Sequence, residues 1–354
     1  MPLRLLIVSD TLPPDPNGIA LIAVRTAEIL SKSADVHLIG PGGGGQICAD
    51  VAYSGVSRLP IGTPDLHIAR PALRLVSAAV LSADRVVVHT PGALGLWALR
   101  CASRQGKPST LFLHNDYRAL FRHGLPRTPA ARLVDWVAAR LESWSTRMAT
   151  RVVAPWAVPH MGYEMLRLTP PRYALDAPSA TANGHITVAY HGRVSREKAV
   201  DATVRAIHAA DPEHRRLTFR IIGDGSQLQS TLGLAARLGV RVEHVPWCED
   251  PRRALGDVQI YAMASRTETF SMTALEAIGC GLPLIARRVG QVQTYVQHDV
   301  NGLLFDSDDE LPGLLDSLAS DAATRARLSQ NARLSATDRT LWEQFAAASI
   351  DPVS

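Results

Sequence analysis

Two glutamates, Glu268 and Glu276, are separated by seven residues within the stretch from Ser265 to Pro283. Apolar residues precede this stretch. Its order of polar, helix-forming and helix-ending residues predicts a strand, a turn and a short helix over Met272 to Ile278. Glu268 falls in the turn, where an acid can meet a ligand, and Glu276 falls inside the helix. For a lone pair of glutamates, a solvated turn residue and a helix acid favoured by the dipole would be the simpler interpretation.

The start of this short helix is a candidate anion site. Thr269 or Ser271 is expected to act as the N-cap by accepting hydrogen bonds from the first free backbone N–H groups. A helix N-terminus attracts anions, phosphates above all, because its unpaired donors carry partial positive charge. We therefore expect a phosphate-bearing ligand beyond the end of the preceding strand.

A second cluster, HGRVSREK from His191 to Lys198, follows the first strand expected in the second half of the chain. Gly192 allows a ligand to approach the backbone, and Arg193 and Lys198 place two cations at the carboxyl end of that strand. Two cations beside a helix N-terminus suit a diphosphate, whose departure requires charge neutralisation. Either cation alone would be interpreted as a surface residue. The turn at Gly223, at the end of the next strand, favours the functional interpretation.

The first half of the chain offers two further candidates at strand ends. Arg4 to Ser9 is expected to be a buried strand, followed by a loop that contains Asn17-Gly18 and by a helix over Ile19 to Leu30. This is the start of a βαβ unit, whose loop lies at the carboxyl edge of a parallel sheet. His114 follows a later strand. A histidine there is more often structural than catalytic, but its expected position at the same edge makes it a candidate.

The alternation of strands and helices predicts an α/β protein with two doubly wound, Rossmann-like domains. We assign residues 1–167 to an N-terminal Rossmann-like domain, 168–184 to a linker, 185–335 to a C-terminal Rossmann-like domain, and 336–354 to a helix that returns toward the first domain. The other expected strands are Asp35–Ile39, Arg85–His89, Ser109–Leu113, Arg151–Ala154, Ile186–Tyr190, Leu217–Ile222, Val240–Val245, Val258–Met263 and Leu284–Ala286. The other expected helices are Leu94–Arg104, Ala130–Met148, Val158–Leu166, Ala199–Ala210, Gln227–Leu238, Leu311–Leu318, Ala322–Leu334 and Thr340–Ala348.

The composition is that of a folded protein: 46% of the 354 residues are hydrophobic and 20% are charged. The net charge of +4 comes almost wholly from arginine. These arginines form no basic run, so a nucleic-acid groove is not expected. The charge is compatible with binding of an anionic ligand or of a membrane surface. The four cysteines are far apart and show no metal-ligand spacing, which indicates a reducing compartment.

The opening residues PLRLLIVSDTLPP form too short an apolar run for a signal peptide or a membrane span. We expect a cytoplasmic protein with no transmembrane segment, for which peripheral membrane contact stays open.

Four segments, in this order and at these intervals, resemble the family 4 glycosyltransferases. They are HGRVSREK, IIGDG, ALGDVQIYAMASRTETFSMTALEAIGCGLPLIA and VNGLLF. The resemblance is strong over residues 185–306, weaker but collinear over 1–155, and nearest to the mannosyl-, glucosyl- and sulfoquinovosyl-transferase subgroup. Its most specific part is the E-x7-E spacing of Glu268 and Glu276. It implies the GT-B fold, in which two Rossmann-like domains face each other across a cleft.

The resemblance also implies roles for individual residues in a retaining, metal-independent transfer that uses no cofactor besides the nucleotide-sugar donor. Arg193 and Lys198 would bind the donor diphosphate, Glu276 would hydrogen-bond the ribose hydroxyls, and Glu268 and His114 would lie by the transferred sugar. The leaving phosphate would take the proton of an acceptor that attacks on the same face. The remaining donor-binding positions are Asn17, Gly18, Gly192, Gly223 and the backbone of Phe270, Ser271 and Met272.

Three departures from the family pattern suggest an unusual donor or acceptor. Asn17-Gly18 replaces the usual Gly-Gly pair, and Thr294 replaces an acid that commonly meets a sugar hydroxyl. The segment before the second domain, PPRYALDAP, is degenerate.

We therefore expect a retaining glycosyltransferase that moves a sugar from a UDP- or GDP-linked donor to an acceptor hydroxyl, in specialised-metabolite, glycolipid or polysaccharide biosynthesis. The acceptor would be a small or lipid-linked molecule; the base, the sugar and the oligomeric state stay open. The alternative is a nucleotide-sugar-binding protein without transferase activity. A dinucleotide-dependent oxidoreductase is not expected, because the glycine fingerprint and its downstream acid are missing.

Overall fold

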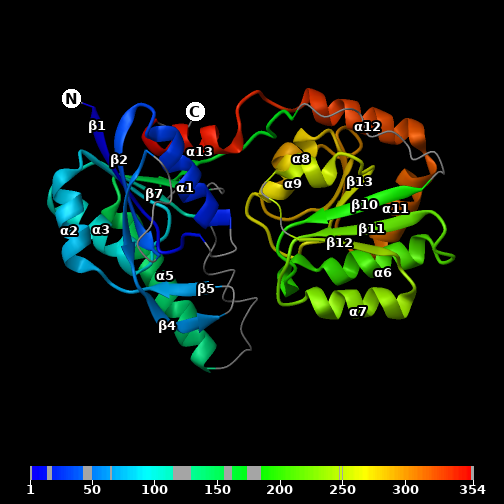
Figure 1. Cartoon of the computed structure of the whole chain (residues 1–354), viewed down its shortest axis with the longest axis horizontal. Helices are drawn as coiled ribbons and strands as arrows, with labels where there is room; N and C mark the ends of the chain where they lie inside the picture. The colour runs from blue at the N-terminus through cyan, green and yellow to red at the C-terminus, as the bar shows by residue number, and fades with distance from the viewer. Residues whose placement is uncertain are drawn as a thin grey trace. The chain divides into compact units, whose positions relative to one another are not determined.

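The computed structural model describes residues 2–13, 18–42, 50–63, 66–114, 129–154, 162–173, 185–246, 248 and 250–351. The chain forms two compact units, Met1–Leu166 with Trp342–Ser354 and Arg167–Leu341. Figure 1 shows that each unit is built around its own sheet. Asn17 and most of the expected linker, residues 174–184, lie outside the described residues.

The first unit contains a parallel sheet with the strand order β3-β2-β1-β6-β7-β8-β9. Its central strands are short apolar runs such as LRLLIV in β1 and RVVV in β6, as expected for parallel strands that are covered on both faces. The strands are β1 Leu3–Val8, β2 Ala34–Pro41, β3 Ala52–Val56, β6 Arg85–Val88, β7 Ser109–Phe112, β8 Arg151–Ala154 and β9 Glu164–Met165. β4 Arg58–Thr63 and β5 Leu66–Ala69 form a separate antiparallel pair.

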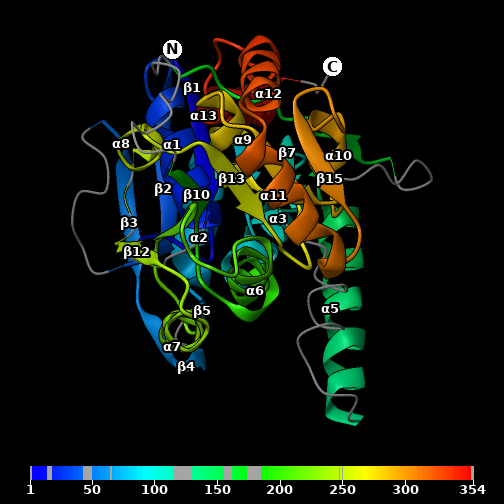
Figure 2. The ribbon, with the colours of Figure 1, turned by 90° about the vertical axis from the view of Figure 1, so that its right-hand side faces the viewer.

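Helices cover this sheet and include one from the end of the chain. They are α1 Gly18–Leu30, α2 Leu73–Ser82, α3 Ala93–Arg104, α5 Pro129–Met148 and α13 Leu341–Ile350. The helices α2, α3 and α5 pack side by side, and Figure 2 shows the length of α5. In α13, Phe345 packs on Phe112 with ring centroids 6.2 Å apart, and the Ser349 carbonyl accepts a hydrogen bond from Thr110 Oγ1 at 3.2 Å. The end of the chain therefore completes the core of the first unit.

The expected helix over Val158 to Leu166 is wrong in its described part. Glu164 and Met165 form strand β9 instead, which pairs in parallel with β8. Gly162 has a φ of +67°, a left-handed conformation that ends a helix. The described end of this segment therefore extends the edge of the sheet, which the helical spacing of the sequence does not predict.

The second unit also contains a parallel sheet, with the order β12-β11-β10-β13-β14-β15. The strands are β10 Ile186–His191, β11 Leu217–Ile222, β12 Val242–Val245, β13 Ile260–Met263, β14 Leu284–Arg287 and β15 Gly302–Phe305. The order reverses between β10 and β13. In open α/β sheets, ligands bind at the carboxyl ends of the strands on either side of such a reversal.

Helices cover both faces of this second sheet. The helices α6, α7 and α11 pack on one face and α8, α9 and α12 on the other (Figure 1). The helices, including two short 3-10 turns, are η2 Arg196–Lys198, α6 Val200–Ala210, α7 Leu228–Leu238, α8 Pro251–Leu255, α9 Met272–Gly279, α10 Val292–Tyr295, η3 Asp308–Glu310, α11 Leu311–Ser320 and α12 Ala322–Leu334.

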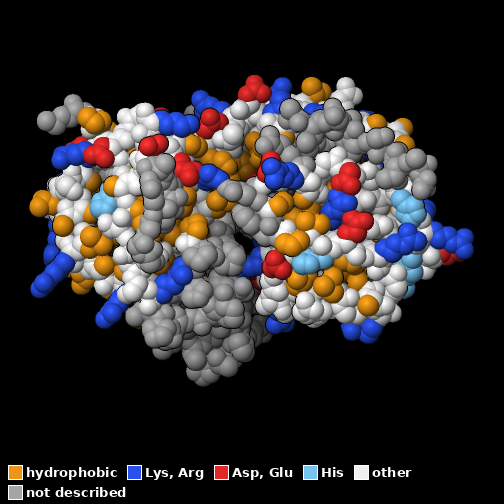
Figure 3. Space-filling view, in the orientation of Figure 1, with side chains coloured by type: hydrophobic (Ala, Val, Ile, Leu, Met, Phe, Trp, Pro, Cys, Tyr) orange, Lys and Arg blue, Asp and Glu red, His pale blue; other side chains and the backbone are white. Residues whose placement is uncertain are grey.

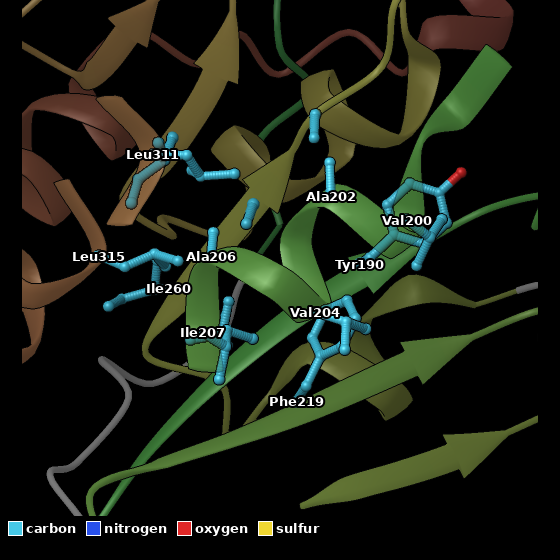
Figure 4. Packing of buried hydrophobic residues seen from close by; sticks show 14 of the residues in the cluster. Tyr190, Val200, Ala202, Val204, Ala206, Ile207, Phe219, Ile260, Leu311 and Leu315 are labelled. Carbon is cyan, nitrogen blue, oxygen red and sulfur yellow. The ribbon is translucent and has the colours of Figure 1, made fainter. Parts of the chain in front are cut away.

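The core of the second unit lies between α6 and the strands. Val200, Val204 and Ile207 follow helical spacing along α6 and are almost completely buried. Figure 4 shows them in one apolar cluster with Tyr190 of β10 and Phe219 of β11. This packing fixes the N-terminal end of α6 directly after the loop that follows β10.

Acidic and basic side chains are interspersed over the face shown in Figure 3. In the described ranges, no helix has both the length and the apolar character needed to cross a membrane.

Glycines interlock the turns that follow β10 and β11. Gly223 has a φ of +121°, and a Cβ there would lie 2.3 Å from the Gly192 carbonyl oxygen. Gly225 has a φ of +154°, and its Cβ would lie 2.4 Å from the carbonyl oxygen of Val194. The Val194 amide donates a hydrogen bond to the Asp224 carbonyl at 2.8 Å. Only residues without a side chain allow these two loops to pack this closely.

Replacing Gly223 by alanine is therefore expected to lower the free energy of unfolding by about 2–4 kcal/mol, because both the backbone conformation and the Gly192 carbonyl oppose a Cβ. Urea unfolding measures the change. The control is Gly313→Ala in α11, where an added Cβ meets nothing within 4 Å. There alanine is expected to leave stability unchanged or to raise it by up to about 1 kcal/mol. Equal changes in the free energy of unfolding for the two substitutions would contradict the close packing of the turns after β10 and β11.

Candidate active site

The loops that follow β10 and β13 meet at the strand-order reversal of the second sheet. Lys198 Nζ and Glu268 Oε1 are 2.8 Å apart. The Arg266 amide donates a hydrogen bond to the Glu197 carbonyl at 2.8 Å, so the two loops are also joined through their backbones. The structure thus brings together two residues, Lys198 and Glu268, that the sequence places 70 positions apart.

The ion pair is largely removed from water. The Glu268 side chain is 6% exposed and that of Lys198 is 22% exposed. An ammonium has three donors, so Lys198 can hold Glu268 and still donate hydrogen bonds to an anion at the more exposed side. Removing one partner would leave a buried charge unpaired, which is strongly destabilising. The pair therefore fixes both side chains before any ligand arrives.

Arg193 forms an ion pair with Glu197, an acid of the same loop after β10. Its Nη2 lies 2.9 Å from Glu197 Oε1, which also accepts a hydrogen bond from Ser195 Oγ at 2.7 Å. Burial alone would raise the pKa of Glu197, but the Ser195 hydroxyl and the nearby cations outweigh burial and lower this pKa. Glu197 thus stays charged and orients Arg193. About a third of the Arg193 side chain remains exposed.

The N-terminus of α9 carries free donors, but its cap differs from the expectation. Ser271 is the N-cap by position, yet its side chain caps no backbone N–H group; its hydroxyl donates to Met263 Sδ at 3.0 Å. The residue has a φ of 48°, which turns the chain sharply into the helix. Among the described residues, no acceptor contacts the backbone N–H groups of Met272 and Thr273. These groups can meet an anion.

A neighbouring loop supports the turn before α9. The Gln291 amide donates to the Thr269 carbonyl at 2.9 Å, and Tyr295 Oη donates to the Phe270 carbonyl at 2.7 Å. A Cβ on Gly290 would lie 2.2 Å from the carbonyl oxygen of Glu268. Thr294, which stands where an acid is usual, bonds to the carbonyl of Gln291 at 2.7 Å. In this loop Thr294 stabilises the short helix α10.

Glu276 lies within α9 in a nearly dry position with only 8% of the residue exposed. No side chain or backbone group in the described part of the chain hydrogen-bonds its carboxyl group; His191 Nδ1 is 3.8 Å from Oε2. Burial raises the pKa of Glu276 to about 8, with a contribution from Asp250. Burial also lowers the pKa of His191 to about 4. Buried polar groups without partners are uncommon, so this pair is suited to a ligand that supplies hydroxyl groups.

The first unit places Asp10 at the strand-order reversal between β1 and β6. Its carboxyl oxygens accept hydrogen bonds from the Leu94 amide at 2.8 Å, the Gly95 amide at 3.2 Å and Thr90 Oγ1 at 2.9 Å. Burial raises the pKa of Asp10, although these hydrogen bonds oppose the rise. Asp10 therefore occupies the N-terminus of α3, so this helix start is not available to a ligand. Gly18 is the first residue of α1.

His114 lies just beyond β7 and is 4% exposed. Its Nε2 is 3.0 Å from Nδ1 of His89, which follows β6 and is completely buried. Burial, together with His89, lowers the pKa of His114 well below its usual value. His114 is therefore a neutral, oriented ring at the carboxyl edge of the first sheet.

Sequence reasoning missed three residues of these clusters: Asp10, His89 and His191. Each directly follows or ends a predicted strand, so strand-end position was the signal that could have found them. Their partners, however, come from other strands or helices, and only the sheet order identifies these partners. Within the described ranges, no three His, Cys, Asp or Glu side chains are grouped in a way that could hold a metal ion.

Two family models match most of the chain. Residues 16–156 match "Glycosyltransferase Family 4", and residues 174–335 match "Glycosyl transferases group 1". The chain belongs to glycosyltransferase family 4. The resemblance inferred from the sequence motifs is thereby confirmed.

Named relatives of this family 4 glycosyltransferase include two kinds of enzyme. It is 35% identical to a D-inositol 3-phosphate glycosyltransferase of Xylanimonas cellulosilytica, over 46% of this chain and 41% of the relative. It is 26% identical to a GDP-mannose-dependent alpha-mannosyltransferase of Mycobacterium tuberculosis, over 95% of this chain and 93% of the relative. The chain thus aligns with less than half the length of the first relative and nearly all of the second.

Solved structures share the architecture. The structure of Anabaena Alr3699/HepE in complex with UDP and glucose matches 99% of this chain with a TM-score of 0.73 and 18% identity. WaaG, a glycosyltransferase involved in lipopolysaccharide biosynthesis, matches 98% with a TM-score of 0.68 and 15% identity. The expected GT-B class, with two Rossmann-like units, is confirmed by this likeness.

The buried acid gives a pH prediction. Because the folded chain holds the pKa of Glu276 near 8 and the unfolded value is 4.5, the protonated form stabilises the fold. This contribution is complete below pH 4.5 and is lost as pH rises through 8. Glu276→Gln is therefore expected to gain about 4 kcal/mol relative to the wild type between about pH 5 and pH 9. Urea unfolding at both pH values measures the gain.

The control for this experiment is Glu213→Gln, because the Glu213 side chain is 70% exposed. The control is expected to have the same free energy of unfolding as the wild type at both pH values. A constant difference between Glu276→Gln and the wild type would show that Glu276 ionises normally.

Proposed function

We propose that this chain is a glycosyltransferase that moves a sugar from a nucleoside-diphosphate sugar to an acceptor hydroxyl. The observation that carries the proposal is the cluster at the strand-order reversal of the second unit. There, the Lys198–Glu268 pair, Arg193 and the start of α9 lie on adjoining loops. The names of the relatives, which specify sugar transfer and GDP-mannose, and the UDP bound to Alr3699/HepE support a UDP- or GDP-linked donor.

The proposed mechanism neutralises the leaving diphosphate with fixed charges. Lys198 is oriented by its ion pair with Glu268, and Arg193 by its ion pair with Glu197. The backbone N–H groups of Met272 and Thr273 add partial positive charge. Groups that are already in place stabilise the charge of the transition state without reorganising. We propose that the transfer is metal-independent and retains the anomeric configuration, with the leaving phosphate taking the proton of the acceptor.

The donor nucleotide is proposed to bind through its ribose at Glu276. A carboxyl group can hydrogen-bond two neighbouring hydroxyl groups, and when it is protonated it donates to one and accepts from the other. The ribose would thus satisfy the acid that has no such partner in the described part of the chain. We propose that Gly192 lets the phosphates approach its backbone, and that Gly223 allows the packing that holds Gly192 in place. Phe270, Ser271 and Met272 would contact the sugar and phosphates through their backbone.

Replacing either cation is expected to lower turnover more than donor binding. Lys198→Ala and Arg193→Ala should each reduce kcat by about 10²–10³-fold, because charge stabilisation is needed most in the transition state. The nucleotide is first identified by melting-temperature shifts with UDP, GDP, ADP and TDP, where a ligand at about 100 times its Kd adds about 2.7 kcal/mol. Release of nucleoside diphosphate from the matching donor then measures turnover.

Arg327→Ala is the matched control, because Arg327 forms an exposed ion pair with Asp299 in the same unit. It should leave turnover unchanged. Unchanged turnover in both cation variants would overturn the proposed mechanism. Nucleotide binding by the wild type without hydrolysis or transfer from any donor would instead favour the alternative, a binding protein without transferase activity.

We propose that the acceptor is lipid-linked and that α5 brings the chain to a membrane surface from the cytoplasmic side. One face of α5 exposes two tryptophans, Trp136 at 59% and Trp144 at 44%, together with Val137 and Leu141. Arg140 lies on the same face, over the Trp136 ring at 5.6 Å. Tryptophan with arginine is typical of helices that lie in the interface of an anionic bilayer.

The full chain is accordingly expected to sediment with anionic phosphatidylglycerol vesicles and less with phosphatidylcholine vesicles. Replacing Trp136 and Trp144 together by alanine should reduce the bound fraction at least about fivefold, because each ring buries a large apolar surface. Leu334→Ala is the control, since Leu334 is a 74% exposed apolar residue of the other unit. If the wild-type chain sediments with neither vesicle type, the proposed membrane contact is wrong.

A further inference from the structure

His89 holds the ring of His114 through one buried hydrogen bond. The bond joins His89 Nδ1 and His114 Nε2 at 3.0 Å, and the two ring planes differ by 16°. Phe112 stacks on both rings, with centroids 5.1 Å from His89 and 5.6 Å from His114. Phe345 of α13 packs against the ring of His114 at 5.8 Å. The orientation of His114 is thus set by packing and by one polar contact.

Neither ring is charged at neutral pH. Burial lowers the pKa of His89 to about 3, and burial together with His89 lowers that of His114 well below its usual value. In the described part of the chain, His89 is the one titratable side chain whose charge acts on His114. Phe112 and Phe345, which pack on the ring, are uncharged. One proton is therefore shared in the bond, and the residue that donates it determines the tautomer of both rings.

The surroundings of His89 decide which ring donates. His89 Nε2 is buried and has no hydrogen-bond partner among the described residues. If His114 donated the proton, His89 would carry its own proton on Nε2, as a buried N–H group without an acceptor. Orphaned N–H groups are rarer in proteins than under-satisfied acceptors. If His89 Nδ1–H is the donor instead, His89 Nε2 carries only a lone pair, and the unsatisfied buried group is an acceptor and not an N–H group.

We propose that His89 is a positioning residue that donates its Nδ1–H to His114 and so keeps His114 as a neutral ring with its proton on Nδ1. This inference rests on the proposed function, in which His114 lies by the transferred sugar. His114 then offers an N–H donor to a sugar oxygen and no lone pair, so it serves as a hydrogen-bonding group and not as a general base.

A neutral donor suits this chemistry better than a charged one. Transfer from an anomeric carbon passes through an oxocarbenium-like state, in which positive charge builds on the sugar. An imidazolium beside that charge would raise the barrier by Coulomb repulsion, which is strong where water is excluded. His89 contributes by holding a polar N–H group near the sugar without a net charge.

The tautomer is measured directly by ¹⁵N NMR of the full chain with labelled histidine. The wild type is expected to show the His114 proton on Nδ1. His89→Asn keeps a donor, because the asparagine amide nitrogen takes the place of Nδ1, and should preserve this signature. His89→Leu has nearly the shape of asparagine and no donor, so the hydrogen bond that fixes the tautomer is lost and His114 is expected to show a mixture of both tautomers.

Kinetics of the same variants test the consequence. His89→Leu is expected to lower kcat about tenfold with the donor KM changed less than about threefold, which is the effect of one misdirected hydrogen bond. His89→Asn should stay within about threefold of the wild type. The control is Thr110→Val in β7, which removes the hydrogen bond to Ser349 and should lower the melting temperature without changing the tautomer or kcat.

A His114 proton on Nε2 in the wild type would overturn the inference. Equal loss of kcat in His89→Asn and His89→Leu would overturn it too, because it would show that His89 acts only through packing. If the wild type transfers no sugar, the proposed function fails, while the NMR comparison of the three forms still decides the role of His89.

Discussion

The ion pair between Lys198 and Glu268 is the contact on which the second unit's site depends. It joins the loops after two adjacent strands, β10 and β13, at the point where the sheet order reverses. Both side chains are largely shielded from water, so removing either one would leave the other buried without its partner. The pair therefore couples the geometry of the site to the stability of the fold. Arg193 with Glu197 repeats the same arrangement within one loop.

Three other groups are buried in ways that folding alone does not explain. Glu276 and His191 lie 3.8 Å apart, too far for a hydrogen bond, and burial shifts both toward their neutral forms. His89 keeps one ring nitrogen without a hydrogen-bond partner among the residues that the structure describes. Unsatisfied buried polar groups lower stability, so they persist mainly where a ligand or a reaction uses them. In each unit these groups follow the carboxyl ends of strands or lie in the helix beside them.

Regular periodicity made much of the fold predictable. The helix over Ala322–Leu334 and the strand over Leu217–Ile222 have the bounds that their patterns indicated. The prediction failed at Val158 to Leu166, where Gly162 turns the chain and the following residues join the sheet edge. It also missed α2, Leu73–Ser82, which packs on α3 with a narrow apolar face. Edge strands and short helices depend on contacts with segments distant in the sequence, which no local sequence pattern specifies.

The sequence by itself determined which loops carry the chemistry, because strands, turns and helix starts are encoded within about ten residues of each site. It also placed glycines where the backbone needs a positive φ, as at Gly223. Only the tertiary structure decided the partners: Lys198 with Glu268, His114 with His89, and Glu276 beside His191. The same structure gave Ser271 a sulfur acceptor in place of a cap. The physical reason is that sheet order and burial, which set these distances and protonation states, arise from contacts between distant segments.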